Sequence, residues 1–459
     1  MVFLMAIVSI NPATGEKIKE YREFSSEEVE DIISKSDALF KDWRKVSFNE
    51  KKKLMLKAAQ ILRDNKEEYA KMLTLEMGKI LRDAIAEVEK CAWVCEFYAE
   101  KAEEFLKPEI VKTEARKSFV SFQPLGVILA VMPWNFPYWQ VFRFAAPALM
   151  AGNVCILKHA SNVPGSALII EEVFRKAGFP EFAFKTLLIG SSQVSSVIEN
   201  EAVKAITLTG STPAGKAVAS KAGEMLKKTV LELGGSDPYI ILEDADNEET
   251  VMTCVNSRLI NAGQSCIAAK RFIVVKSKIK EFQKDFVEYM KSMKMGDPFD
   301  ATTNVGPQAR HDLRDELHQQ VLRSIELGAE LLLGGYIPDN PGAFYPPTVL
   351  TNVRKGMPAY DEELFGPVAS IIEAQSEEEA ISIANDTVFG LGAAIFTGDI
   401  QKGEKLAIES IEAGSCFVNT FVKSDPRLPF GGIKQSGYGR ELSDYGMKEF
   451  VNIKTVYVK

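Results

Sequence analysis

Val127-Ile128-Leu129-Ala130-Val131-Met132 is an uninterrupted run of apolar residues. A strand that is buried on both faces of a sheet has this continuous pattern, whereas a strand with one solvated face alternates apolar and polar residues. Further short apolar runs follow it, and helical patterns lie between them, which is the order of βαβ units around a parallel sheet. The expected strands cover residues 154–157, 186–189, 205–208 and 239–242, and the expected helices cover 165–177 and 214–226. The run at 127–132 therefore predicts an α/β fold.

The same alternation continues on both sides of this region. A second series of strand-like runs lies at 271–275, 368–372 and 392–396 and predicts another α/β unit. Residues 25–106 have mostly helical periodicity. Residues 110–122 instead alternate apolar with charged side chains, which is typical of a hairpin or a projecting ribbon. The apolar opening at residues 1–10 predicts an edge strand or a frayed end.

Composition and charge exclude several classes of protein. The chain has 459 residues, 46% hydrophobic and 26% charged, which is enough for two or three domains with substantial cores. Its net charge of −8 is spread along the chain without a basic block, so no nucleic-acid partner is expected. Residues 1–10 are too few to span a bilayer and lack a basic leader, so no membrane partner is expected either. Six cysteines without a Cys-x-x-Cys pair predict reduced thiols in a cytoplasmic protein, and with three histidines no metal site is expected.

Gly210 to Ala217 nearly matches a phosphate-binding loop between a strand and a helix. Ala217 has no hydroxyl to hold Mg²⁺, and Pro213 removes a backbone donor, so a triphosphatase is not expected. The helix N-terminus at Thr209-Gly210-Ser211 either binds a pyrophosphate through its N–H groups or is a structural turn. No Gly-x-Gly-x-x-Gly occurs, although a dinucleotide can still bind at the carboxyl ends of parallel strands.

Lys158 directly follows the run at 154–157, and Ser161 comes three residues later. Together they place an ammonium group and a hydroxyl at the carboxyl edge of the sheet, where a ribose or a phosphate could dock. Lys158 on its own is more simply an exposed loop lysine.

Three further residues carry candidate chemistry. Cys266 follows a glycine and small polar residues rather than lying in an apolar run, so it is either a reactive thiol or a buried inert one. Glu232 lies between two leucines and is either a partly desolvated base or a capped surface glutamate. Asn135, between two aromatic residues, either donates its amide to a developing oxyanion or is structural.

Taken together, these segments resemble the aldehyde dehydrogenase superfamily, and the resemblance covers essentially the whole chain. The motifs that carry it, in chain order, are residues 133–137, Lys158, residues 209–211, 232–235 and 261–266, Glu363-Leu364-Phe365-Gly366-Pro367 and Pro429-Phe430-Gly431-Gly432.

The resemblance implies a fold with three parts. A Rossmann-like NAD(P)-binding domain would comprise residues 1–105 and 124–234, and an α/β catalytic domain residues 235–435. A projecting β oligomerisation domain would comprise residues 106–123 and 440–459. Its C-terminal strand, 451–458, would complete the ribbon of a neighbouring subunit in a homodimer or homotetramer.

The resemblance also implies roles for individual residues. Cys266 would attack the aldehyde, and Asn135 and the Cys266 backbone N–H would stabilise the oxyanion. Hydride would then leave for the nicotinamide, and Glu232 would activate the water that releases the acid. Glu363 would bind the nicotinamide ribose, Phe365 would pack near the ring, and Lys158 would reach the adenosine ribose. The full set of expected cofactor-binding residues is Trp134, Lys158, Ser161, Thr209, Gly210, Ser211, Gly215, Leu233, Glu363 and Phe365.

Ser161 departs from the pattern of many NAD-preferring members, which have a glutamate at this position. The glutamate would repel a 2′-phosphate, whereas Ser161 and the nearby Lys158 offer donors to it. The expected cofactor is therefore NADP, with NAD as a weaker alternative.

Arg143 is a cation in an aromatic-rich helical segment, and it resembles the arginine that binds the substrate carboxylate in succinate-semialdehyde dehydrogenases. Ser424 lies in a loop similar to one that assists carboxylate binding in that subgroup. The expected reaction is therefore oxidation of succinate semialdehyde to succinate, and Arg143→Ala should raise KM for the semialdehyde more than for a neutral aldehyde. The alternatives are a structural salt bridge of Arg143 to a neighbouring subunit, another aldehyde substrate, CoA-acylating transfer and a catalytically silent homologue.

Overall fold

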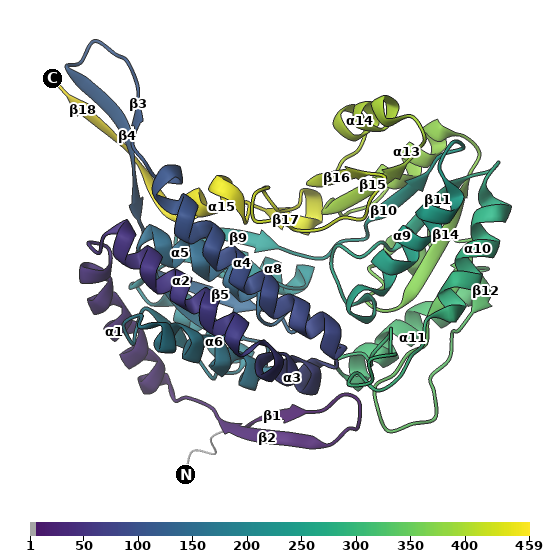
Figure 1. Cartoon of the computed structure of the whole chain (residues 1–459), viewed down its shortest axis with the longest axis horizontal. Helices are drawn as coiled ribbons and strands as arrows, with labels where there is room; N and C mark the ends of the chain where they lie inside the picture. The colour runs from purple at the N-terminus through teal and green to yellow at the C-terminus, as the bar shows by residue number, and fades with distance from the viewer. Residues whose placement is uncertain (1–5) are drawn as a thin grey trace.

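The computed structural model describes residues 6–459 as two α/β units, each built on its own sheet, and two small antiparallel sheets. Figure 1 shows the two α/β units side by side, with a ribbon that carries the C-terminus projecting from the first. Of the predicted strand at residues 1–10, β1 (Ala6–Ile10) pairs antiparallel with β2 (Lys17–Arg22), and residues 1–5 lie outside the described residues. Within residues 6–459, no helix combines the length and apolar character needed to cross a bilayer.

The first unit is built on a six-stranded sheet with the order β17-β9-β8-β5-β6-β7. Its strands are β5 (Val127–Met132), β6 (Val154–His159), β7 (Phe184–Thr186), β8 (Val203–Thr209), β9 (Lys228–Glu232) and β17 (Gly437–Tyr438). All are parallel except β17, and β5 lies between β8 and β6, as expected of a strand buried on both faces. The predicted α/β fold is confirmed.

One predicted strand of this sheet is misplaced. Residues 186–189 were expected to form it, but β7 ends at Thr186. The Ile189 N–H donates to the Leu187 carbonyl (3.0 Å), which turns the chain out of strand geometry. Leu187 and Ile189 are nevertheless buried, so their apolar character indicates burial and not a strand.

Helices cover the first sheet, and α1 and α2 each begin with a capping box, Ser25 with Glu28 and Ser47 with Glu50. The longer helices are α1 (Ser26–Trp43), α2 (Phe48–Asp64), α3 (Lys66–Met77), α4 (Leu81–Phe105), α5 (Trp139–Ala151), α6 (Pro164–Ala177) and α8 (Thr212–Glu224). The shorter ones are η1 (Ser191–Gln193), α7 (Val194–Glu199), η3 (Lys434–Ser436) and α15 (Ser443–Glu449).

The second unit has a seven-stranded sheet with the order β12-β13-β14-β11-β10-β15-β16, parallel except for β12. Its strands are β10 (Pro238–Ile241), β11 (Arg271–Val275), β12 (Glu330–Leu333), β13 (Thr348–Thr351), β14 (Val368–Ala374), β15 (Gly392–Phe396) and β16 (Ser415–Val418). Its helices are α9 (Asn247–Leu259), η2 (Ile260–Gly263), α10 (Ile279–Ser292), α11 (His311–Glu326), α12 (Pro358–Asp361), α13 (Glu377–Asn385) and α14 (Ile400–Glu409).

The projecting ribbon consists of β3 (Glu109–Ile110), β4 (Lys117–Pro124) and β18 (Val451–Val458). The tail was expected to complete the ribbon of a neighbouring subunit, but β18 pairs with β4 of its own chain along its whole length. Residues 440–450 were also assigned to the ribbon, yet α15 lies against α4 and α5, and Leu442 and Met447 belong to the core of the first unit. This packing brings the end of the chain to the base of its own β4.

The order β9-β8-β5-β6 has a direct consequence for the site. Parallel strands end at the same edge of a sheet, so the segments that follow these four strands lie next to one another. Asn135, Lys158, Thr209 and Glu232 all lie at or just beyond the ends of these strands. The fold therefore gathers four of the predicted site residues at one edge.

Candidate active site

A cavity of about 270 Å³ lies at this edge, between the two units. The ends of β5, β8 and β9 contribute one wall, and Cys266, Glu363 and Phe365 contribute the other. The Trp134 and Phe365 rings meet edge to face across it, with centroids 5.7 Å apart. The predicted residues that line this cavity are Trp134, Asn135, Thr209, Gly210, Ser211, Leu233, Cys266, Glu363 and Phe365.

The turn from β8 to α8 presents a helix N-terminus to this cavity. Ser211 is the N-cap of α8, and its hydroxyl accepts the Ala214 N–H at 3.5 Å. Gly215 lies in the first turn, where an added Cβ would lie 2.5 Å from the Leu233 side chain. Glycine is therefore needed for α8 to approach the end of β9. The predicted anion site is thus a helix N-terminus that borders the cavity, where backbone N–H groups could bind a pyrophosphate.

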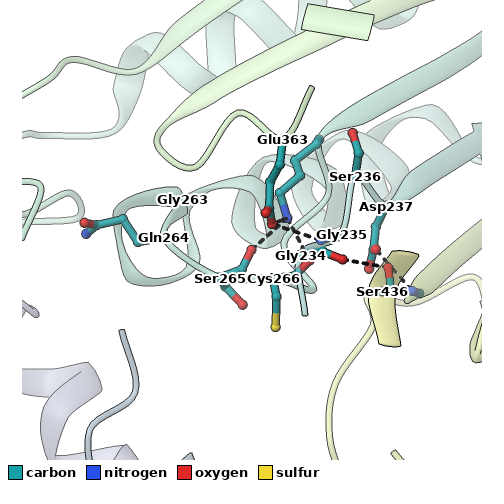
Figure 2. A network of polar contacts seen from close by, with 12 residues as sticks. Gly234, Gly235, Ser236, Asp237, Gly263, Gln264, Ser265, Cys266, Glu363 and Ser436 are labelled. Carbon is teal, nitrogen blue, oxygen red and sulfur yellow. Dashed lines mark hydrogen bonds and ion pairs between the residues drawn. The ribbon is translucent and has the colours of Figure 1, made fainter. Parts of the chain in front are cut away.

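Glu363 is fixed from two directions. Its carboxylate accepts the Gly235 N–H at 3.0 Å and lies 3.4 Å from the Lys270 ammonium. Lys270 in turn donates to the backbone carbonyls of Ser265 (2.8 Å) and Cys266 (2.7 Å). Figure 2 shows this network, with the Cys266 sulfur pointing away from it. The network therefore holds the backbone of the thiol loop while leaving the sulfur itself unengaged.

The loop before Cys266 has an unusual backbone. Asn261, Ala262 and Gly263 have φ values of 55°, 53° and 77°, three consecutive residues in the left-handed region. Left-handed geometry is costly for residues with a Cβ, and such strain persists where the surroundings impose it. Gly263 is required for a second reason, because an added Cβ would collide with the Gly366 carbonyl. This tight loop directs Cys266 toward the cavity.

Hydrogen bonds fix the orientation of the Asn135 amide beside this loop. Its Oδ1 accepts from the Gln140 side chain (3.0 Å), and its Nδ2 donates to the Gln264 carbonyl (3.1 Å). Asn261 donates to the Asn135 carbonyl at 2.7 Å and holds its backbone. One Nδ2 hydrogen is therefore committed to Gln264, and the other is available to a bound group beside Cys266.

A second cavity, of about 210 Å³, meets the first at Cys266. Cys266 and Gln140 line both cavities. The second cavity is also lined by the predicted substrate residues Arg143 and Ser424, and by Lys90, Trp139 and Phe430. The thiol thus lies where a group in one cavity can meet a group in the other.

Arg143 is already engaged within its own chain. Its Nε forms an ion pair with Glu441, both side chains being buried, and its Nη2 donates to the Thr209 hydroxyl at 3.2 Å. Its guanidinium also lies over the Phe430 ring, 4.9 Å from the centroid. Arg143 therefore does form an ion pair, as one alternative expected. Its partner lies in the same chain and not in a neighbouring subunit.

Ser424 forms a small cluster with two residues that the sequence did not single out. Its Oγ accepts from Lys90 Nζ (2.9 Å) and from Trp139 Nε1 (3.1 Å). The Lys90 ammonium lies over the Trp139 ring, 4.2 Å from the centroid. In the sequence Lys90 looks like a surface lysine of an amphipathic helix, and only the fold brings it to Ser424.

Glu232 lines neither cavity. It is buried at the end of β9, where its backbone pairs with Gly437 of β17, and its side chain lies close to Gly431. Burial, together with the nearby Glu441 carboxylate, raises the pKa of Glu232 well above its usual value, while Arg143 and Arg440 lower it. In this position the side chain is adjacent to the site rather than within it.

Lys158 and Ser161 line a third cavity, of about 610 Å³, together with residues of β1 and residues 309–312. Glu23, Asn162 and Arg310 also line it. Lys158 is buried, and this burial lowers its pKa while the Glu23 carboxylate raises it. The predicted pair therefore shares one cavity, separate from the one that holds the thiol.

Burial raises the pKa of the Cys266 thiol to about 12, against a smaller lowering by Lys270 and then Arg143. Because the thiolate is the reactive form, the rate of alkylation by iodoacetamide should rise about tenfold per pH unit between pH 7 and 9. Peptide mapping of the unliganded protein would measure this rate at Cys266 itself. A rate that levels off below pH 8 would contradict the raised pKa.

Residues 5–456 match the aldehyde dehydrogenase family, and the chain belongs to this family of oxidoreductases that act on aldehydes. It is 53% identical over 454 residues to a Synechocystis protein named probable succinate-semialdehyde dehydrogenase (NADP+), covering 99% of this chain and 100% of that protein. It is 50% identical over 458 residues to the Mycobacterium avium succinate-semialdehyde dehydrogenase (NADP+), covering 99% and 97%. The crystal structure of succinic semialdehyde dehydrogenase from Streptococcus pyogenes in complex with NADP+ is similar with a TM-score of 0.97, 41% identity and coverage of 99% and 100%. The resemblance based on the motifs is confirmed.

Proposed function

We propose that this protein oxidises succinate semialdehyde to succinate, with NADP+ as the hydride acceptor and a thioacyl intermediate on Cys266. The observation that carries the proposal is the position of Cys266 on the shared boundary of two cavities. A thiol there can hold an aldehyde carbon from one cavity against a hydride acceptor in the other. The names of the relatives support the choice of substrate and cofactor.

The residues of this chain supply the first chemical step. The Cys266 thiolate attacks the carbonyl carbon and forms a C–S bond, and the carbonyl oxygen becomes an oxyanion. The available Nδ2 hydrogen of Asn135 can donate to this oxygen. The Cys266 backbone N–H can also donate, since within residues 6–459 it has no hydrogen-bond acceptor. Collapse of the oxyanion expels hydride and leaves the acyl group on sulfur.

The residues around the first and third cavities support the binding of a dinucleotide. The N-terminus of α8 offers N–H groups to a pyrophosphate, and Trp134, Leu233, Glu363 and Phe365 surround the space next to the thiol. Bound NADP+ supplies the hydride acceptor. In this proposal Glu363, held by Gly235 and Lys270, accepts hydrogen bonds from a ribose, and Lys158 and Ser161 contact the adenosine end.

We propose that Glu232 activates the water that hydrolyses the thioacyl group. The side chain must then rotate from its position near Gly431 toward Cys266, because it lines neither cavity as it stands. Its raised pKa makes the ionised carboxylate a stronger base than that of an ordinary glutamate. Since water is the acyl acceptor in this proposal, added CoA should not change the rate of turnover.

The test is steady-state reduction of NADP+ and of NAD+ with succinate semialdehyde and with pentanal, an uncharged aldehyde of similar length. The proposal expects the highest kcat/KM for NADP+ with the semialdehyde. Equal kcat/KM values for the two aldehydes would overturn the proposal that succinate semialdehyde is the substrate. The enzyme would then be an aldehyde dehydrogenase of broad specificity. No reduction of either cofactor with any aldehyde would identify a catalytically silent homologue.

Ser161→Glu should move the cofactor preference from NADP+ toward NAD+. The new carboxylate would lie beside Lys158, neutralise it and repel the 2′-phosphate. The ratio of kcat/KM for NADP+ to that for NAD+ should fall at least about tenfold, a change of about 1.4 kcal/mol in relative binding. Ser161→Gln, of similar size without the charge, is the control, and an unchanged ratio in Ser161→Glu would refute the role of Ser161.

We also propose that the protein acts as a homodimer or homotetramer in the cytoplasm. The ribbon of β3, β4 and β18 projects from the first unit and exposes Ile110, Ile453 and Tyr457, an apolar surface that a second copy would cover. All six cysteines of the protein are free thiols, which agrees with a reducing compartment.

A further inference from the structure

Lys90 is a cation in the second cavity without a counter-charge. It comes from the middle of α4, is partly buried, and reaches Ser424 at the wall of that cavity. Within residues 6–459, no carboxylate oxygen lies within 4.0 Å of its ammonium nitrogen. Charged groups withdrawn from water are normally paired, because desolvation of an unpaired charge is costly.

Three buried cations near this cavity are paired with carboxylates. Arg143 has Glu441, Lys79 has Glu87, and Lys270 has Glu363. Glu87 also lines the cavity, but its second oxygen accepts the backbone N–H groups of Tyr138 (2.9 Å) and Trp139 (3.0 Å). Glu87 is therefore already paired with Lys79, and Lys90 is a partly buried cation of the cavity wall without an ion-pair partner, whereas Lys423, the other such cation among the described residues of the wall, is exposed to solvent.

The titration of Lys90 agrees with this geometry. Burial, and then the nearby Arg143, lower its pKa to about 8, while Cys91, Glu87 and Asp425 oppose the shift. An incoming anion would relieve the cost of this desolvated charge. Asp425, the remaining carboxylate nearby, is ion-paired with Arg427 at 2.6 Å.

Ser424 supplies the second element of an anion site. Its oxygen has two lone pairs, and these accept the hydrogen bonds from Lys90 and from Trp139. The hydroxyl hydrogen is then left to donate, and a carboxylate oxygen in the cavity is the acceptor that this arrangement suits. Lys90 and Ser424 thus point a charge and a hydrogen-bond donor toward the same space.

We propose that Lys90 and Ser424 together bind the distal carboxylate of the substrate, and that Lys90 thereby sets the preference for an ω-carboxylate aldehyde over a neutral one. This inference rests on the proposed function and names the group that recognises its substrate. Arg143, whose charge is balanced by Glu441, lines the same wall and can add a hydrogen bond, but it does not supply the net charge.

Lys90→Met, which keeps the length and removes the charge, tests the proposal. The ratio of kcat/KM for succinate semialdehyde to that for pentanal should fall about 10- to 100-fold, the range for loss of a charge-assisted hydrogen bond. Lys90→Arg should restore much of the ratio. Lys423→Met is the matched control, since Lys423 is an exposed cation at the rim of the same cavity and should leave the ratio within about twofold.

Calorimetric titration of each variant with succinate, in the presence of NADP+, gives a readout independent of turnover. Binding of succinate should weaken in Lys90→Met and in Ser424→Ala, while NADP+ affinity shows that each variant is folded. A wild-type enzyme that prefers succinate semialdehyde, with Lys90→Met keeping that preference, would overturn the role of Lys90 alone. A wild-type enzyme without the preference would overturn the proposed substrate itself.

Discussion

Cys266→Ser is expected to lower kcat by about a thousandfold or more with every aldehyde, because a serine hydroxyl is a far weaker nucleophile than a thiolate. The structure offers no substitute for this thiol. The sulfur points away from the network that holds its loop, and among the described residues 6–459 no other thiol lines either cavity. Steady-state reduction of NADP+ measures the loss, and fluorescence titration should show that the variant still binds NADP+.

Cys416→Ser is the matched control for this experiment. Cys416 is also only partly buried, and burial likewise raises its pKa to about 12, but it lies on the edge strand β16 away from both cavities. Its replacement should leave kcat unchanged. If Cys266→Ser kept more than a tenth of the wild-type kcat, the thioacyl mechanism would be excluded.

The sequence predicts a strand correctly where an apolar run is buried because it lies in the middle of a sheet. The run at 127–132 becomes β5 at the same boundaries, because a strand in the middle of a parallel sheet must be apolar on both faces. The run at 186–189 misleads for a related reason. Leu187 and Ile189 are buried in a turn, and apolar character alone does not distinguish a buried turn from a buried strand.

The residues of the candidate site also divide into those that the sequence could place and those that it could not. Residues next to a strand end, such as Asn135 and Thr209, could be placed from the sequence, because parallel topology determines where strand ends meet. Lys90 and Glu441 could not, since each acts through a partner distant in the chain: Lys90 contacts Ser424 across 334 residues. Long-range ion pairs and hydrogen bonds leave no local pattern in the sequence.

Arg143→Met is expected to reduce the free energy of unfolding by about 3 kcal/mol, because it leaves Glu441 buried without its partner. It should also lower activity with neutral and charged aldehydes alike, which differs from the selective effect expected from the sequence. Arg143 lowers the pKa of Glu232, so its loss raises that pKa further and moves the acidic limb of the kcat profile to higher pH.

Glu441→Gln should shift the same limb in the opposite direction. The Glu441 carboxylate raises the pKa of Glu232, so its removal lowers that pKa and lets Glu232 lose its proton at lower pH. The pH dependence of thioacyl hydrolysis, followed after a single turnover, measures both shifts. A purely structural ion pair would change stability in both variants and leave the two profiles superimposed. Opposite displacements would instead show that the Arg143–Glu441 pair tunes the pKa of Glu232.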